Sequence, residues 1–223
     1  MITVTNLSKI FRTEEIETTA LNGVSFEIKD GEFVAIMGPS GCGKSTLLNI
    51  LGLLDNPTSG SYELLGTEVA NLKEKERTKF RKGNIGFVFQ SFNLIPQLTA
   101  AENVELPLIY QRVRRAERRR RVTEALKRVQ LTSRVNHLPS ELSGGQQQRV
   151  AIARAIAAHP SLILADEPTG NLDSHTGQDI MTIFHELHES GNTIVLITHD
   201  DTVARQAQRS IHILDGHVRE VEA

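Results

Sequence analysis

The stretch "GPSGCGKST", residues 38 to 46, decides the fold of this chain. It follows the apolar run "EFVAIM" and leads into "STLLNILGLL", which has a helical pattern. The stretch matches G-x-x-x-x-G-K-[ST], in which glycines let successive N–H groups turn inward around phosphate oxygens. The following helix adds the positive end of its dipole. We therefore expect a strand, a loop that binds a nucleoside triphosphate, and a helix, in that order.

Two side chains of this phosphate loop (residues 38–46) have predicted roles. Lys44 is expected to reach the terminal phosphates, and Ser45 to offer its hydroxyl to Mg²⁺. The other predicted binding positions in the loop are Gly38, Ser40, Gly41, Cys42, Gly43 and Thr46. Cys42 is either a small buried filler or a reactive thiol at a helix N-terminus. We expect its modification to block nucleotide binding.

The composition is that of a globular protein, since 39% of the 223 residues are hydrophobic and 23% are charged. Such a chain holds one large domain, or a core carrying a subdomain. No apolar run approaches the roughly 18 to 20 residues that span a bilayer, and "MITVTNLSKIF" lacks signal-peptide features. The net charge of −2 argues against nucleic acid as a partner. The single cysteine fits a reducing cytoplasm.

One segment departs from the nearly neutral charge of the chain, because "QRVRRAERRRR", residues 111 to 121, contains seven arginines. The ordinary interpretation is the solvated face of an exposed helix. The alternatives are contact with anionic lipid headgroups and, more remotely, nucleic acid.

Runs typical of strands alternate with helical patterns along the chain. The runs are "ITVTNL", "VSFEI", "EFVAIM", "NIGFVFQ", "SLILADE" and "TIVLITHD". Ile180, Ile183, Phe184 and Leu187 follow helical spacing. This alternation predicts an α/β fold with a mostly parallel sheet covered by helices. The early runs, with "SYELLG", predict an antiparallel accessory sheet, and residues 93–150 a helical insertion.

Chemically active side chains follow several of the predicted strands, namely Gln90, Asp166 with Glu167, and His199. In such sheets ligands bind beyond the carboxyl ends of the strands. We expect Asp166 in the Mg²⁺ shell through water, and Glu167 to orient the attacking water and accept its proton. His199 is expected to contact the terminal phosphate or this water, the alternative being a structural histidine.

A second glycine-rich stretch, "LSGGQQQR", residues 142 to 149, also suits an anion at a helix start. Together with the phosphate loop, Gln90, "LADEP", "NLD" and His199, it resembles the ATP-binding subunit of an ABC transporter over essentially the whole chain. The resemblance implies ATP with Mg²⁺ and a P-loop NTPase core of the RecA-like kind. Residues 1–92 and 154–223 would form the core with its β accessory sheet, and residues 93–153 the helical subdomain.

The resemblance also implies that two copies pack head to tail as a homodimer that parts after hydrolysis. Ser143, Gly144 and Gly145 would cap the terminal phosphate held by the other copy, with Gln146 as support. Gln90 would sense Mg²⁺ and the water, and Asp173 would serve communication between the two sites. Phe11 lies where the family places an aromatic ring on adenine, although an ordinary core aromatic is the alternative.

Four stretches are similar to the lipoprotein-releasing and macrolide-exporter branch: "RTEEIETTALNGVSF", "GLLDNPTSG", "FNLIPQLTAAENVELPLIY" and "LADEPTGNLD". This implies an ATPase at the cytoplasmic face of the cell membrane that drives export or extraction by separate integral membrane permease subunits. The alternative is control of cell-wall hydrolases through a membrane partner, without transport. Residues 91–105 and the helical insertion are the candidate docking surface, although their apolar side chains also suit a core.

Overall fold

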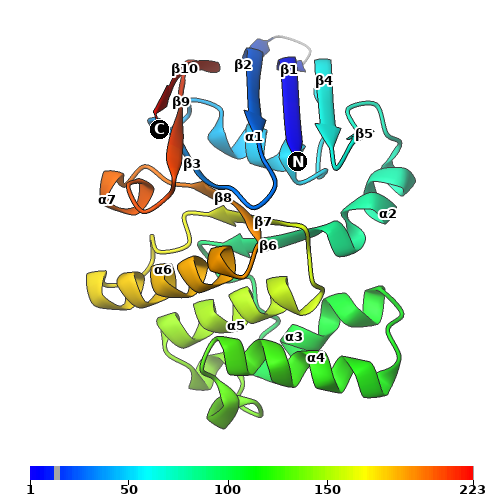
Figure 1. Ribbon diagram of the computed structural model, residues 1–223, viewed down its shortest axis with the longest axis vertical. Helices are drawn as coiled ribbons and strands as arrows, with labels where there is room; N and C mark the ends of the chain where they lie inside the picture. Colours follow the sequence, from blue (N-terminus) through cyan, green and yellow to red (C-terminus); the bar gives the residue numbers. More distant parts are fainter. Residues whose placement is uncertain (13–15, 223) are drawn as a thin grey trace. The chain divides into compact units, whose positions relative to one another are not determined.

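The computed structural model describes residues 1–12 and 16–222, so part of the stretch "RTEEIETTALNGVSF" lies outside the described residues. The chain forms two compact units (Figure 1). Unit 1 comprises Met1–Arg81 and Thr193–Ala223, and unit 2 comprises Lys82–Asn192. The boundary falls inside α2 (Glu74–Asn84), where Lys82 and Gly83 leave helical geometry.

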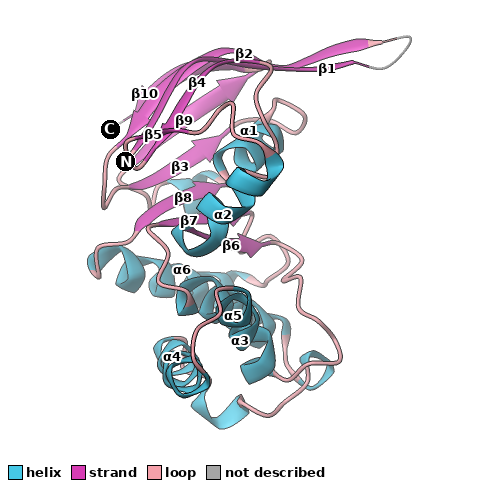
Figure 2. Cartoon of the chain, turned by 90° about the vertical axis from the view of Figure 1, so that its right-hand side faces the viewer, coloured by secondary structure: helices cyan, strands magenta, loops and turns pink. Residues whose placement is uncertain are grey.

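Unit 1 contains an antiparallel sheet with the strand order β2-β1-β4-β5. Its strands are β1 (Ile2–Arg12), β2 (Glu17–Ile28), β4 (Ser59–Leu64) and β5 (Thr67–Glu68). Figure 2 shows β1 and β2 running side by side as a long ribbon. The hydroxyl of the fully buried Tyr62 donates to the Leu51 carbonyl at 2.8 Å. The predicted accessory sheet is therefore confirmed, with strands longer than the apolar runs indicated.

The other strands of unit 1 follow the order β10-β9-β3-β8. Their bounds are β3 (Phe33–Met37), β8 (Thr193–Ile197), β9 (Arg209–Leu214) and β10 (His217–Glu222), and the helices of this unit besides α2 are α1 (Lys44–Leu51) and α7 (Asp201–Ala204). β3 is parallel to both β8 and β9, and every residue of β3 and β8 is buried. Parallel strands buried on both faces read as continuous apolar runs, which is why "FVAIM" and "TIVLI" were recognisable.

Unit 2 combines two parallel strands with four long helices. Its elements are β6 (Ile85–Phe89), α3 (Ala100–Tyr110), α4 (Arg115–Arg128), two short 3₁₀ turns (Thr132–Arg134 and Pro139–Glu141), α5 (Gly144–Ala157), β7 (Leu162–Asp166) and α6 (Ser174–Glu189). α5 packs against α3, α4, α6 and β6 (Figure 1). The chain between β6 and β7 contains helices and no strand, as the sequence predicts.

The apolar stripe predicted for α6 is buried, and so is a second stripe on α4. In α6 the stripe consists of Ile180, Ile183, Phe184 and Leu187. In α4 it consists of Val122, Ala125 and Leu126. Within the described parts of the chain, no helix has the length and apolar character needed to cross a bilayer.

Candidate nucleotide site

The phosphate loop leaves β3 after Met37 and enters α1 at Lys44, as predicted. Gly38 and Gly43 have φ values of 151° and 107°, which lie in the region that favours glycine. A Cβ at Gly38 would lie 2.2 Å from the Ile213 carbonyl oxygen, and one at Gly43 would lie 2.4 Å from the Ala20 oxygen. Glycine is therefore required at both positions by backbone geometry and by close approach.

The Lys44 ammonium lies against the loop. Its Nζ donates to the carbonyls of Gly38 at 2.7 Å and Pro39 at 2.8 Å. No side chain caps the N-terminus of α1, so its first N–H groups remain for an anion. Ser45 is exposed and offers a hydroxyl oxygen, the kind of ligand that Mg²⁺ prefers. The glycine cradle, the ammonium and the helix end fit a triphosphate.

The loop is braced by the β9–β10 turn, which the sequence analysis missed. The Gly216 N–H donates to the Cys42 carbonyl at 3.1 Å, and the Asn22 N–H donates to the Gly216 carbonyl at 2.8 Å. Asp215 and Gly216 both have positive φ, as a two-residue hairpin turn requires. The dipeptide Asp-Gly between two runs of strand length was the signal that could have identified this hairpin. Cys42 lies within the loop and is buried.

His199 and Phe11 also belong to unit 1. Ile36 of β3 is in register with Ile197 of β8, so His199 follows at the same carboxyl edge as the phosphate loop. Phe11 lies on β1 and its side chain is 46% exposed, with the Lys9 ammonium 5.1 Å from the ring centroid. A core position for Phe11, the alternative from the sequence, is therefore wrong.

Unit 2 carries the carboxylates and Gln90. Phe89 of β6 is in register with Asp166 of β7, so Gln90 and Glu167 follow the ends of neighbouring strands. The Gln90 side chain donates from Nε2 to Asn171 Oδ1 at 3.2 Å, and Asn171 Nδ2 donates to the backbone carbonyl of Gln90 at 3.0 Å. Glu167 itself has a left-handed φ of 46°. This places Gln90 against the loop that begins at Glu167.

The second glycine stretch forms the start of α5. Ser143 is its N-cap: Ser143 Oγ accepts from the Gln146 N–H at 3.3 Å, and Gln146 Oε1 accepts from the Ser143 N–H at 3.1 Å. A Cβ at Gly145 would lie 2.3 Å from Thr176 Cγ2. These residues, 143–146, form a corner with N–H groups at a helix start, and we name it the signature corner.

Asp173 caps the neighbouring helix α6. Its carboxylate accepts from the Thr176 hydroxyl at 2.6 Å and from the Thr176 N–H at 3.0 Å. These hydrogen bonds, led by the one from the hydroxyl, lower the pKa of Asp173. Because Thr176 also contacts Gly145, the signature corner and the start of α6 lie together in unit 2.

Arg154 on α5 is a residue that the sequence analysis missed. Its guanidinium donates to the carbonyls of Phe92, at 2.8 Å, and Asn93, and both of these residues have positive φ. Burial lowers the pKa of Arg154. The segment that follows Gln90 is thereby held on α5. An arginine within an apolar helix carries no sequence signal for such a contact.

The predicted site residues are thus distributed over both units. Unit 1 holds Phe11, the phosphate loop and His199, and unit 2 holds Gln90, the signature corner, Asp166, Glu167 and Asp173. Ser45, Asp166 and Gln90 provide hydroxyl, carboxylate and amide oxygens, which suit Mg²⁺. Among the residues that the structure describes, no three or more His, Cys, Asp or Glu side chains form a metal-binding cluster.

Comparison with known proteins identifies the family. The sequence profile of the ABC transporter family matches residues 21–170. The chain is 53% identical to the ABC transporter ATP-binding protein MJ0796 of Methanocaldococcus jannaschii, covering 100% of this chain and 97% of that protein. It is 50% identical to YvrO of Bacillus subtilis, covering 98% and 95%. It is also 50% identical to the macrolide export ATP-binding/permease protein MacB of Brucella melitensis, covering 98% of this chain but 34% of MacB.

A solved structure supports the same assignment. MJ0796, described as a dimer in a post-hydrolysis state bound to ADP and Pi, superposes with a TM-score of 0.91 at 51% identity, covering 100% of this chain and 98% of that one. The fold is therefore that of an ATP-binding cassette, as the sequence predicts. The chain belongs to the ABC transporter family, as an ATP-binding and ATP-hydrolysing subunit.

Proposed function

We propose that this ATPase works as a homodimer around two ATP molecules with Mg²⁺, at the cytoplasmic face of a membrane, and powers export or extraction by separate permease subunits. The observation that carries the proposal is the signature corner, a second helix start suited to an anion in a chain that already has a complete phosphate loop. The naming of MJ0796 as a dimer and of MacB as an ATP-binding/permease protein supports it. Control of cell-wall hydrolases is not favoured, because MacB is named as an export protein.

In the proposed reaction, Lys44 and the loop N–H groups bind the β- and γ-phosphates. Glu167 orients a water and accepts its proton at the carboxylate while the water oxygen attacks the γ-phosphorus. The bond to the β–γ bridging oxygen breaks, which releases ADP and phosphate. His199 contacts the γ-phosphate. Ser45, Gln90 and Asp166 supply oxygen atoms for Mg²⁺, which would offset phosphate charge when bound.

The proposed dimer completes each site with residues of the other copy. Ser143, Gly144 and Gly145 of one copy cap the γ-phosphate held by the phosphate loop of its partner, while Phe11 stacks on adenine. Ser143 Oγ accepts a hydrogen bond within its own cap, so its proton remains for a phosphate oxygen. Asp173 sits beside this corner and serves communication between the sites. Loss of the γ-phosphate removes the attraction, and the copies separate.

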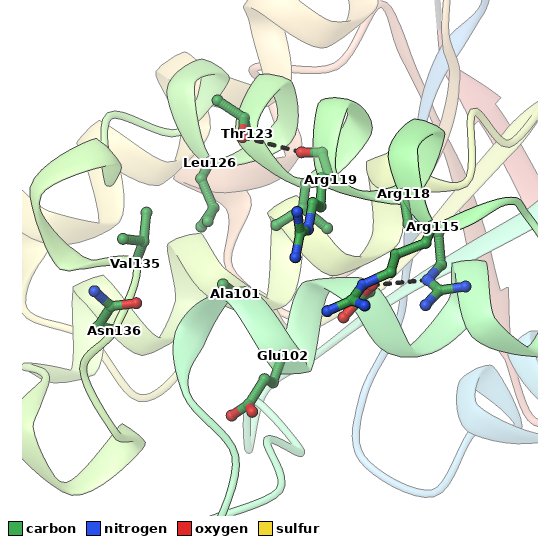
Figure 3. Close-up of a pocket in the computed structure, with 11 residues that line it drawn as sticks. Ala101, Glu102, Arg115, Arg118, Arg119, Thr123, Leu126, Val135 and Asn136 are labelled. Atoms are coloured by element: carbon green, nitrogen blue, oxygen red, sulfur yellow. Dashed lines mark hydrogen bonds and ion pairs between the residues drawn. The ribbon is translucent and has the colours of Figure 1, made fainter.

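The groove between α3 and α4 supports a docking surface for the permease within the helical region. It has a volume of about 800 Å³ (Figure 3). Arg115 and Arg119 lie on its α4 side, with Ala101 on its α3 side. Neither arginine has a carboxylate within ion-pair distance among the described residues, whereas Arg118 pairs with Glu105 at 2.7 Å. A cytoplasmic segment of the permease with an acidic side chain and apolar neighbours fits this groove.

The rest of the arginine-rich run fits a solvated helix face. Arg120 pairs with Glu117 and Glu124, and Arg121 pairs with Glu117, all at 2.7 Å. Hydrogen bonds from Arg120 and then Arg121 lower the pKa of Glu117 to about 2. Arg120 and Arg121 are thus paired with carboxylates of α4 itself, and nucleic acid is not proposed as a partner.

The first test replaces the proposed base. Glu167→Gln should lower kcat by about 100-fold or more, because a positioned base contributes about 10²–10⁴-fold. ATP binding should persist, and the variant should form an ATP-dependent dimer in size-exclusion chromatography. A wild-type hydrolysis rate would refute the role of Glu167.

The second test mixes two inactive chains, Lys44→Ala and Ser143→Arg. Their heterodimer contains one site with both an intact phosphate loop and an intact signature corner. We expect ATP-dependent pairing to return on mixing. If differential tags show that the two chains associate, but ATP does not strengthen this association, each pocket is complete within one chain.

The third test addresses the permease. Arg115→Gln/Arg119→Gln should reduce permease-stimulated ATPase and leave the unstimulated rate unchanged. Arg120→Gln, a loss of charge on the same helix, is the control and should retain stimulation. Equal stimulation in all three proteins would exclude the groove. Capture from membranes with the Glu167→Gln chain and ATP would identify the partner, whose topology separates export from wall-hydrolase control.

A further inference from the structure

Three consecutive glutamines in α5 each make a side-chain hydrogen bond within unit 2. The Gln146 side chain closes the cap at Ser143, and Gln147 Nε2 donates to the Leu142 carbonyl at 3.1 Å. Gln148 Nε2 instead donates to the Pro168 carbonyl at 2.6 Å. Of the three, Gln148 alone reaches the loop that begins at Glu167.

The surroundings of Gln148 leave its side chain a single hydrogen bond among the described residues. Its side chain is fully buried, and Oε1 has no hydrogen-bond partner among the described residues. A buried, unpaired acceptor costs free energy that an apolar side chain of similar length would not. The amide orientation is fixed, because only the NH₂ group can donate to the Pro168 carbonyl. What the glutamine contributes is therefore this one bond.

The Gln148 bond is made to a segment whose backbone conformation is already restricted. Glu167 has a left-handed φ of 46°, and its carbonyl accepts from the Gly170 N–H at 3.0 Å. The next residue, Pro168, is buried and its ring restricts φ. A tether on the Pro168 carbonyl therefore fixes the direction in which the chain leaves Glu167.

We propose that Gln148 is a positioning residue for hydrolysis, which ties the Glu167 loop to the helix that begins with the signature corner. The inference rests on the proposed function, in which this corner meets the γ-phosphate of the partner's ATP. A shift of α5 on meeting that phosphate is carried by Gln148 to Pro168, and so to the Glu167 carboxylate of the same chain. One nucleotide contact thereby adjusts the base that acts on the other nucleotide.

The test compares Gln148→Met with Gln147→Met. Methionine has a similar length and removes the donor, and each variant loses one side-chain bond to a backbone carbonyl of unit 2. For Gln148→Met we expect kcat to fall about tenfold, since small misplacements at an active site cost this much or more. The KM for ATP and the affinity for a fluorescent ATP analogue should stay within about twofold of wild type. Gln147→Met should retain kcat and KM.

Two results would overturn the inference: a Gln148→Met kcat within about twofold of wild type, or an equal loss in both variants. Gln148→Leu removes the same donor and serves as a second variant if Gln148→Met does not fold. Melting temperatures show which of the proteins are folded. Glu167→Gln is measured in parallel. If it hydrolyses ATP at the wild-type rate, the proposed function fails at Glu167. If it is inactive while Gln148→Met is fully active, the positioning role alone fails.

Discussion

The contact between Gly145 and Thr176 can be tested by adding a methyl group at residue 145 and removing one from residue 176. In Gly145→Ala the new Cβ would lie 2.3 Å from Thr176 Cγ2, whereas carbon atoms normally approach to about 3.5–4.0 Å. Thr176 cannot rotate away cheaply, because its hydroxyl is bonded to Asp173 at 2.6 Å and its side chain is branched at Cβ. Gly145→Ala should therefore strain the junction between the signature corner and α6.

The expected changes in stability follow from the overpacking at this contact. Overpacking of this sort costs about 1–3 kcal/mol, which is about 3–9 °C in melting temperature for a chain of this size. Thr176→Ser removes Cγ2 and keeps the hydroxyl, at a cost of at most about 0.8 kcal/mol. In the double variant the alanine methyl occupies the space that Cγ2 leaves. Its stability should be close to wild type, which corresponds to a coupling of about 1–4 kcal/mol.

The assay is urea unfolding of the four proteins of this double-mutant cycle, followed by circular dichroism. If the losses add within about 0.5 kcal/mol, the two residues are not in contact and the reasoning is refuted. ATP-dependent pairing of the double variant is then measured. Restored stability without pairing would indicate that a side chain at residue 145 obstructs the approach of the partner's phosphate.

Three further results are expected. Tyr62→Phe should lower the free energy of unfolding by about 1–2 kcal/mol in urea titration, because it leaves the Leu51 carbonyl without its buried donor; an unchanged midpoint would contradict this. Complete alkylation of Cys42, checked by mass spectrometry, should abolish nucleotide binding, and ATP bound beforehand should slow the reaction; undiminished affinity of the alkylated protein would disprove it. Thr99→Ala should cost about 1 kcal/mol of stability through loss of the α3 capping box, whereas Thr99→Ser should retain most of it.

Features encoded in contiguous residues were predictable from the sequence. The strand, phosphate loop and helix around Lys44 each have a local pattern, and so does the apolar stripe of α6. β9 and β10 were not predicted because their sequences are partly polar, even though Asp215 and Gly216 form a recognisable turn. Their role at the phosphate loop depends on the pairing of β9 with β3, which no local pattern reports.

Side-chain bonds to distant carbonyls were not predictable in the same way. Gln148 and Arg154 lie in α5 and bind carbonyls of Pro168 and of residues 92–93. Any residue has a carbonyl, so the acceptor leaves no trace in the sequence, and the donor is a common helix-forming side chain. Such contacts are set by packing of helices against loops, and they emerge only from the three-dimensional structure.

The caps of α5 and α6 differ in charge, and this difference has a chemical consequence. Aspartate and serine cap a helix about equally well, so helix stability does not select between them. An anionic cap at residue 143 would repel a polyanion arriving from another subunit, whereas a hydroxyl accepts from its own helix and still has a proton to give. Ser143→Asp should accordingly leave the fold intact while preventing association. Electrostatic compatibility with the nucleotide of another subunit, rather than folding, restricts which amino acid can cap α5 at residue 143.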